Sequence, residues 1–270
     1  MLKHFFNRRL RDSYTPAVIL ITGATGAIGA ALAKCYAGPG VILLLQGRQE
    51  RVLDQVAQQC VEMGAEVRPY CIDLLDAPSV IAWLDQLNED YCVDLFIANA
   101  GMNISTGVDN AGECEDEMLQ LLDLNIKATL LMSSYLSKEM RKRGSGKIAL
   151  ISSLAGFYGL PMMPSYCASK AAVKAYGEAL RGWLSGSGVG VTVIMPGNIQ
   201  SAMCDGMLGP KPFLMTPEYA ARVMQRGIAR NAARVSFPFP LNLGTWCLML
   251  LPASVSQKIL RLLSYSRPKG

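Results

Sequence analysis

The sequence predicts an α/β fold, a doubly wound Rossmann-type parallel sheet of about seven strands with helices on both faces. Short apolar runs rich in Val, Ile and Leu recur along the chain, as in strands that are covered on both faces. Longer amphipathic segments alternate with these runs, and such alternation requires parallel strands joined by right-handed crossovers. The length of 270 residues is enough to bury the core of one such domain.

The predicted elements follow one another without an internal repeat. The runs predicted as strands are Ala17–Thr22, Val41–Gln46, Glu66–Cys71, Val93–Ala98, Lys147–Ser152, Val189–Met195 and Arg234–Phe237. The helical segments begin near Ala27, Glu50, Ala77, Glu115 and Ser165, and residues 217–231 form a further one. Residues 197–217 contain many Gly, Pro and Met residues, and we expect a long loop or lid there.

Composition and charge exclude several classes of protein. The 51% hydrophobic content excludes a disordered chain, and the net charge of +5 is too small and dispersed to predict nucleic-acid binding. Eight cysteines without a C-x-x-C pair predict reduced thiols in a cytoplasmic protein. The single histidine, His4, leaves no ligand spacing for a metal and no imidazole for a Ser-His-Asp or Cys-His hydrolase. We therefore expect no metal site.

A glycine-rich turn follows the first predicted strand and opens the first helix. Residues 22–29 read TGATGAIG. Glycines permit the tight turn and let the backbone approach a pyrophosphate at the positive end of the helix. The same turn could be only a tight strand-to-helix connection, but its position after the first strand favours a dinucleotide site.

Tyr166 and Lys170 lie four residues apart in a predicted helix, and therefore on one helical face. An ammonium group favours a neighbouring phenolate, so we expect Lys170 to lower the Tyr166 pKa from its usual value of about 10. Such a tyrosine can donate a proton to a carbonyl or accept one from an alcohol. The spacing is equally that of an ordinary surface pair. Ser153 ends the fifth strand, at the sheet edge where doubly wound folds bind ligands, although such a serine can also be only a cap.

Taken together, these residues resemble the short-chain dehydrogenases/reductases. The resemblance runs from about Val18 to Ser201, and Ser153 precedes Tyr166 by thirteen residues, the usual spacing in that family. The motifs that carry it are the glycine turn, Asp73, Asn99-Ala100-Gly101, Asn125, Ser153, Tyr166, Lys170 and Pro196-Gly197.

The resemblance implies roles for these residues. Tyr166 would be the acid/base, Ser153 would bind the substrate oxygen, and Lys170 would contact the nicotinamide ribose. Asn125 would hold a water in the proton relay, and Asp73 would contact the adenine. The residues implied to bind the cofactor are Gly23, Thr25, Gly26, Ile28, Gly29, Arg48, Asp73, Leu74, Asn99, Ala100, Gly101, Tyr166, Lys170, Pro196, Gly197 and Ile199.

The glycine turn departs from the short branch of that family, which usually reads TGxxxGxG. Residues 22–29 follow TGxxGxxG, with Ala27 where the second glycine is expected. That spacing is commoner in the extended branch, which acts on nucleotide sugars. The chain length, Asn99-Ala100-Gly101 and the spacing of Ser153 and Tyr166 favour the short branch.

The end of the second strand bears on the choice of cofactor. An acidic residue there would bind the ribose 2′-hydroxyl of NAD, but residues 46–48 read QGR. Arg48 could pair with a 2′-phosphate, which favours NADP(H) over NAD(H). Alternatively, Arg48 only caps a solvated loop.

The chain is divided into a basic segment (1–16), a dinucleotide-binding and catalytic domain (17–237) and an apolar and basic helical extension (238–270). The apolar run Leu241–Leu251 is about half the ~20 residues needed to cross a bilayer. Ser254–Tyr265 combines Leu and Ile residues with Lys258 and Arg261, as in helices that lie at a membrane interface. The extension is expected to pack on the domain, on a partner subunit or on a membrane surface.

The expected function is an NADP(H)-dependent oxidoreductase that interconverts a ketone and a secondary alcohol on a small lipophilic substrate. The methionines near the expected cleft suit an apolar ligand, and equally an ordinary core. We expect a cytoplasmic homo-oligomer, with peripheral membrane contact through the C-terminal helix as an open alternative. Two other functions remain open at this point: a non-catalytic cofactor-binding regulator, and an extended-type enzyme acting on a nucleotide sugar.

Overall fold

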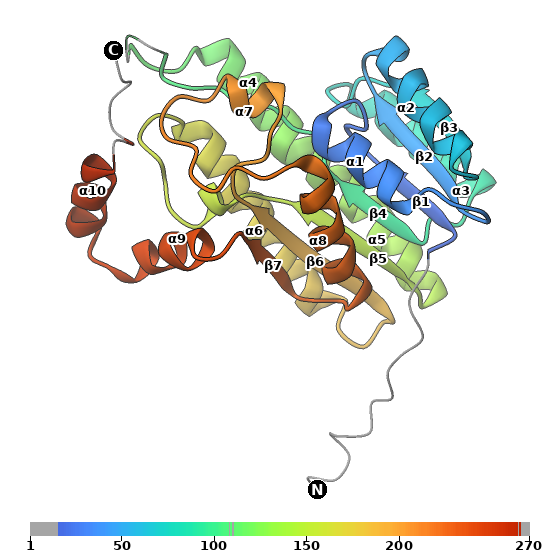
Figure 1. Cartoon of the computed structure of the whole chain (residues 1–270). Coiled ribbons are helices and arrows are strands. Elements are labelled where there is room, and N and C mark those ends of the chain that lie inside the picture. Colours follow the sequence, from blue (N-terminus) through green and yellow to red (C-terminus); the bar gives the residue numbers. More distant parts are fainter. Residues whose placement is uncertain (1–15, 108, 110, 264, 266–270) are drawn as a thin grey trace, which may run out of the picture.

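A computed structural model of the chain describes residues 16–107, 109, 111–263 and 265. They form a seven-stranded parallel sheet in the order β3-β2-β1-β4-β5-β6-β7, with helices on both faces (Figure 1). The strands are β1 (Val18–Ile21), β2 (Ile42–Gly47), β3 (Glu66–Cys71), β4 (Leu95–Ala98), β5 (Gly146–Ile151), β6 (Val189–Pro196) and β7 (Arg234–Phe237). The predicted fold class is confirmed. The strand order reverses between β1 and β4, which places a ligand crevice at their carboxyl ends.

Alternation along the strands builds two cores, one on each face of the sheet. Ile19 and Ile21 of β1 belong to one core, while Leu20 between them belongs to the other. Helices α1 (Ala27–Tyr36), α2 (Glu50–Glu62) and α8 (Pro217–Ala229) cover the first face. Helices α3 (Ala77–Asp90), α5 (Thr129–Arg143) and α6 (Pro164–Trp183) cover the second.

The long helical stretch after residue 114 is interrupted. It begins as α4 (Glu115–Leu122), passes through a π-helical segment (Asp123–Ala128) and continues as α5. The sequence predicted the helix but not the π-helical segment. Such segments appear mostly as single-turn bulges and frequently mark functional sites.

Residues 197–217 are less irregular than the sequence suggested. They contain a short helix, α7 (Ala202–Asp205), and Ile199 pairs with Met215 in an isolated parallel bridge. After β7 the chain forms α9 (Leu241–Leu250) and α10 (Ala253–Leu262) at the β7 edge of the sheet (Figure 1). Helix α9 contacts β7 and the 3-10 turn at Leu154–Gly156, and α10 contacts α9.

Within the described part of the chain, no helix combines the length and the apolar character needed to cross a membrane. Of the basic segment predicted at 1–16, only Pro16 is described.

Candidate active site

A cavity of about 710 Å³ opens at the carboxyl edge of the sheet. Most of the predicted site residues line it. Those that do are Gly23, Thr25, Gly26, Ile28, Arg48, Leu74, Asn99, Ala100, Gly101, Ser153, Tyr166, Lys170, Pro196, Gly197 and Ile199. Gly29, Asp73 and Asn125 lie outside the lining. Asp73 is exposed, and its carboxylate accepts a hydrogen bond from Leu75 N at 3.1 Å.

The glycine turn is shaped by close backbone contacts. Gly23 has a φ of +65°, and a Cβ built there would lie 2.8 Å from the Ala100 Cα atom. A Cβ on Gly29 would lie 2.2 Å from the Gly23 carbonyl oxygen, whereas one on Gly26 would lie 3.4 Å from it. Gly29 is therefore required by packing, even though it does not line the cavity.

Two buried polar side chains that sequence reasoning missed hold this turn in place. Gln46 accepts a hydrogen bond from Gly23 N at 3.0 Å and donates one to Ile72 O at 2.6 Å. Thr22 Oγ1 accepts from Asn99 N at 3.0 Å and from Ala100 N at 3.1 Å. The sequence signal for Gln46 was its position at the end of an apolar strand, because a polar side chain buried there requires hydrogen-bond partners.

The residues around the turn fit a dinucleotide. Gly26 is the N-cap residue of α1 and has no side chain that could cap the helix. Gly26, Ala27 and Ile28 line the cavity, so the uncapped beginning of the helix lies at the cavity. Such a helix terminus attracts phosphate. The charged residues of the described lining are Arg48, Lys170 and Lys211, and no acidic residue is among them.

Ser153, Tyr166 and Lys170 come together above the sheet. Ser153 follows β5, and its hydroxyl accepts a hydrogen bond from Ala155 N at 3.1 Å and lies near enough to the Tyr166 hydroxyl to favour the phenolate. Lys170 donates a hydrogen bond from Nζ to Ile151 O at 3.1 Å, and Nζ lies 5.6 Å from the centroid of the Tyr166 ring. Tyr166 and Lys170 are 8% and 6% exposed, so the pair is buried rather than an ordinary surface pair.

Burial controls the protonation of this pair. It raises the pKa of Tyr166 to about 12, against the opposing effect of the Ser153 hydrogen bond. Burial also lowers the pKa of Lys170 to about 8. The pKa of Tyr166 shifts in the opposite direction to the one expected from the sequence, so that expectation is wrong for the protein as described. The reason is that desolvation of the phenolate outweighs the favourable interactions.

Asn125 is buried in the π-helical segment and joins two elements of the site. Its Oδ1 accepts from Met102 N at 2.8 Å, and its Nδ2 donates to Met102 O at 2.9 Å and to Ser169 Oγ at 3.0 Å. A Cβ on Gly101 would lie 3.0 Å from Asn125 Oδ1 and 3.5 Å from Lys170 Nζ. Gly101 therefore leaves space between these two polar groups.

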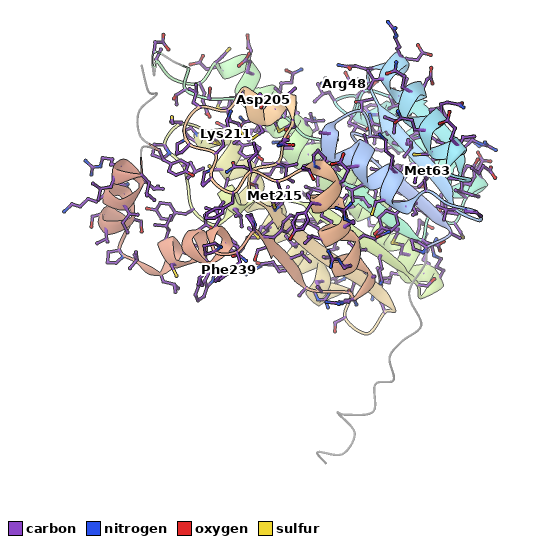
Figure 2. All side chains as sticks on the ribbon, viewed as in Figure 1. Arg48, Met63, Asp205, Lys211, Met215 and Phe239 are labelled. Atoms are coloured by element: carbon purple, nitrogen blue, oxygen red, sulfur yellow. The ribbon has the colours of Figure 1, made fainter. Side chains whose placement is uncertain are left out.

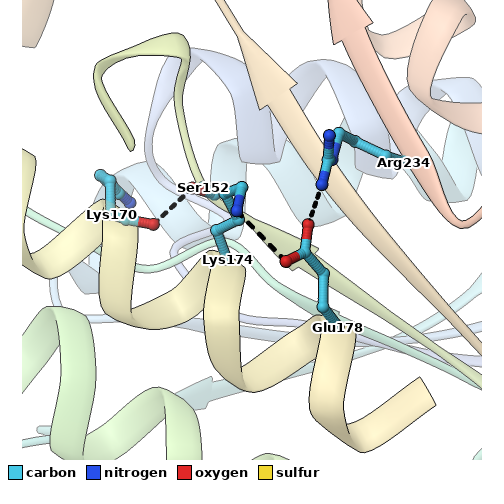
Figure 3. A network of polar contacts seen from close by, with 5 residues as sticks. All are labelled: Ser152, Lys170, Lys174, Glu178 and Arg234. Atoms are coloured by element: carbon cyan, nitrogen blue, oxygen red, sulfur yellow. Dashed lines mark hydrogen bonds and ion pairs between the residues drawn. The ribbon is translucent and has the colours of Figure 1, made fainter. Parts of the chain in front are cut away.

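Helix α6 is fixed by polar contacts with the end of β5 and with β7 (Figure 3). Ser152 Oγ donates to the Lys170 carbonyl oxygen at 2.7 Å, which ties the helix to the end of β5. Further along α6, Glu178 pairs with Lys174 at 3.2 Å and with Arg234 of β7. These contacts fix the position of α6 relative to the sheet, and with it the positions of Tyr166 and Lys170 at the cavity.

Glu113 secures the beginning of α6 from a distant segment. Its carboxylate accepts hydrogen bonds from Ser165 N at 3.1 and 3.2 Å and from the Ser165 hydroxyl. Ser165 directly precedes Tyr166. Sequence reasoning missed this cap, and no local signal could have revealed it, because the two residues are 52 positions apart.

The C-terminal extension supplies one wall of the cavity. The lining residues that come from it are Leu241, Gly244, Thr245, Cys247, Leu248, Leu251, Ile259, Leu260, Leu263 and Tyr265. The extension contacts the rest of the domain through α9, while packing on a partner subunit or on a membrane surface stays a prediction.

Comparison with known proteins places the chain in a family. The family model described as short chain dehydrogenase matches residues 17–208. An "uncharacterized oxidoreductase" of Myxococcus xanthus is 34% identical over 235 residues, which cover 86% of this chain and 92% of that protein. The 3alpha-hydroxysteroid dehydrogenase of Mediterraneibacter gnavus is 31% identical over 189 residues, covering 69% of this chain and 75% of that one.

A solved structure with the same fold is a short-chain dehydrogenase from Sphingobium yanoikuyae in complex with NADPH. It superposes with a TM-score of 0.77 at 26% identity and covers 90% of this chain and 95% of its own.

Proposed function

The chain belongs to the short-chain dehydrogenase family and is an NAD(P)-dependent oxidoreductase acting on CH–OH or C=O groups; from that premise we propose that it uses NADP(H) to interconvert a ketone and a secondary alcohol on a lipophilic substrate. The observation that carries the proposal is that the buried pair Tyr166 and Lys170 and the half-buried Ser153 line one cavity with the glycine turn. We assign catalysis to residues 17–237 and the substrate-side wall to those residues of the extension that line the cavity.

In this proposal, the residues around the glycine turn would hold NADP(H), which would supply or take up the hydride exchanged with the substrate carbon. The Tyr166 hydroxyl donates its proton to the carbonyl oxygen in reduction and takes up the alcohol proton in oxidation. The raised pKa keeps this hydroxyl protonated at neutral pH, which is the form that reduction requires. The Ser153 hydroxyl, which lines the same cavity beside Tyr166, binds the same substrate oxygen and orients it.

Lys170 and Asn125 complete the proton path in the proposal. Lys170 would bind the nicotinamide ribose, and as an ammonium group it stabilises the phenolate that Tyr166 becomes after proton transfer. Asn125 Oδ1 has one acceptor position left after its bond to Met102 N. A water held there, in the space beside Gly101, would return the proton to Tyr166.

The proposed preference for NADP(H) depends on Arg48. This residue is exposed at the cavity, directly after β2, where a guanidinium can pair with a 2′-phosphate. The absence of acidic residues from the described lining supports the same choice, because NAD is usually held by a carboxylate there. The Sphingobium yanoikuyae relative was solved in complex with NADPH.

The lipophilic substrate is supported by the wall that α9 and α10 contribute. Leu248 and Leu260 are buried against the cavity, and Met163, Met203 and Met207 line its other side. The Mediterraneibacter gnavus relative is named for a steroid substrate, which is itself apolar. A cytoplasmic homo-oligomer stays a prediction.

The proposal is tested by Tyr166→Phe, with NADPH oxidation measured on a panel of lipophilic ketones. We expect kcat to fall by about 10²- to 10⁴-fold while the NADPH affinity stays nearly unchanged. Tyr158→Phe is the matched control, because Tyr158 also lines the cavity but donates a hydrogen bond to Ala253 O at 3.4 Å. The mechanism is wrong if Tyr166→Phe keeps most of its kcat.

The same panel separates the other functions. NADPH binding without turnover on any ketone would favour a regulatory protein. Activity on nucleotide sugars and none on lipophilic ketones would favour the extended type, which the spacing of Gly23, Gly26 and Gly29 resembles.

A further inference from the structure

Large apolar side chains are exposed on the outer side of the C-terminal extension. Phe239, Leu250 and Leu262 are 75%, 64% and 84% exposed. Several exposed apolar residues of this extension do not line the cavity, and we call them the tail patch. They are Phe239, Leu243, Trp246, Met249, Leu250, Val255 and Leu262. Contiguous exposed apolar side chains on a protein mark a site of contact with a partner or a membrane.

The other side of the same two helices lines the cavity. Leu248 and Leu260 are buried there, one turn or less from members of the tail patch. Leu251 and Leu263 have both properties, because they line the cavity and are 39% and 55% exposed. The mouth of the cavity at these residues is therefore continuous with the tail patch.

The charge of this region identifies the occupant. Residues 235–257 contain no charged residue, and no acidic residue follows Glu218 in the chain. Lys258 and Arg261 of α10 are both exposed beside the patch. A second copy docked patch to patch would add the same two cations, and the segment after Glu218 would contribute no acidic side chain to offset them. Anionic lipid headgroups would offset them, and the acyl region would accept the apolar side chains.

We propose that the tail patch docks the protein on an anionic lipid bilayer, with α9 and α10 lying in the interface, and that apolar substrate enters the cavity from the bilayer at Leu251 and Leu263. The docking is independent of the function proposed above, whereas the route of entry rests on it.

Docking is tested by flotation of the full-length protein with phosphatidylcholine vesicles, with and without phosphatidylglycerol. We expect binding that is stronger with the anionic lipid and weakened by salt. Leu250→Glu/Leu262→Glu should reduce the partition coefficient about a hundredfold, because each side chain loses its burial in the acyl boundary. Lys258→Gln/Arg261→Gln should remove the preference for anionic lipid. Each lost charge should lower the partition coefficient on anionic vesicles about fivefold.

The matched control places the same charges on an apolar surface elsewhere. Val61 of α2 and Met63, which directly follows α2, are each 47% exposed, and Figure 2 shows Met63 well apart from Phe239. Val61→Glu/Met63→Glu should leave vesicle binding unchanged. The docking proposal is overturned if the wild type does not bind, or if the two double Glu variants bind equally well. It is also overturned if Leu250→Glu/Leu262→Glu only dissociates an oligomer in sedimentation experiments.

Entry from the bilayer is tested with two ketones, one water-soluble and one dissolved in the vesicles. Leu250→Glu/Leu262→Glu should keep the wild-type kcat/KM on the soluble ketone and lose about tenfold or more on the vesicle-dissolved ketone. Equal kcat/KM values for wild type and variant on the vesicle-dissolved ketone would overturn the route of entry. Flotation needs neither cofactor nor substrate, so inactivity on both ketones would contradict the proposed function and leave docking to be decided by flotation.

Discussion

Replacing Gly29 with alanine should damage the glycine turn, although Gly29 does not line the cavity. The new Cβ would lie 2.2 Å from the Gly23 carbonyl oxygen, 2.8 Å from the Gly23 carbonyl carbon and 2.9 Å from the Ala24 Cα atom. All three are backbone atoms that no rotamer change can move, so α1 would have to shift away from β1 by about 1 Å. Overpacking of this kind costs about 1–3 kcal/mol.

Gly26→Ala is the matched substitution within the same turn. Its Cβ would meet only the Gly23 carbonyl oxygen, at 3.4 Å, and its backbone (φ −81°, ψ 159°) suits any residue. Gly26→Ala should therefore lower the free energy of unfolding only by the cost of a less favourable N-cap residue, about 1 kcal/mol or less. The new methyl group would nevertheless stand at the beginning of α1, where the proposed site receives a pyrophosphate, and should weaken NADPH binding about tenfold or more.

Urea denaturation of the apoprotein and titration with NADPH separate these effects. Gly29→Ala should lower the free energy of unfolding by about 1–2 kcal/mol more than Gly26→Ala, with an unchanged m-value. Gly26→Ala should retain the fold and lose cofactor affinity. The packing argument is refuted if Gly29→Ala is as stable as the wild type, or if Gly26→Ala is the less stable of the two.

Three further substitutions test separate parts of the site. Arg48→Ala should raise the Kd of NADPH about tenfold and leave that of NADH nearly unchanged, while Arg51→Ala changes neither; equal losses for both cofactors would show that Arg48 does not bind the 2′-phosphate. The pKa of Lys170 falls from 10.5 unfolded to about 8 folded, so the cost of its burial is present below pH 8 and is relieved as the pH rises towards 10.5. Lys170→Met should therefore be the more stable at about pH 7, with its advantage over the wild type shrinking at about pH 9.5 in urea denaturation; a constant difference would contradict the lowered pKa. Glu113→Ala should lose about 1 kcal/mol of stability with the cap of α6, and exposed Glu115→Ala should lose nothing comparable in the same thermal unfolding assay.

Much of the fold and of the site was predictable because the signals are local. The alternation of apolar runs and amphipathic segments reports a covered parallel sheet directly. The four-residue spacing of Tyr166 and Lys170 requires only a helix, and the position of Ser153 requires only that the parallel strands end at one edge. The structure brings these three residues together in one cavity with the glycine turn.

What could not be predicted depends on contacts across the fold. The π-helical segment around Asn125 accompanies hydrogen bonds to Met102 and Ser169, which no spacing reveals. The raised pKa of Tyr166 depends on how deeply tertiary packing buries the hydroxyl. The cap that Glu113 provides joins residues from different segments.

The proposed catalytic residues and the apolar wall that α9 and α10 contribute come from different parts of the chain. Ser153, Tyr166 and Lys170 all precede β6, whereas the apolar wall begins after β7, at Leu241. Substitutions, insertions or an exchange of the whole segment after β7 can therefore reshape the space offered to a substrate while leaving in the sequence the residues to which we assign proton transfer. For evolution and for engineering alike, this makes the extension the least costly place to change what the enzyme accepts.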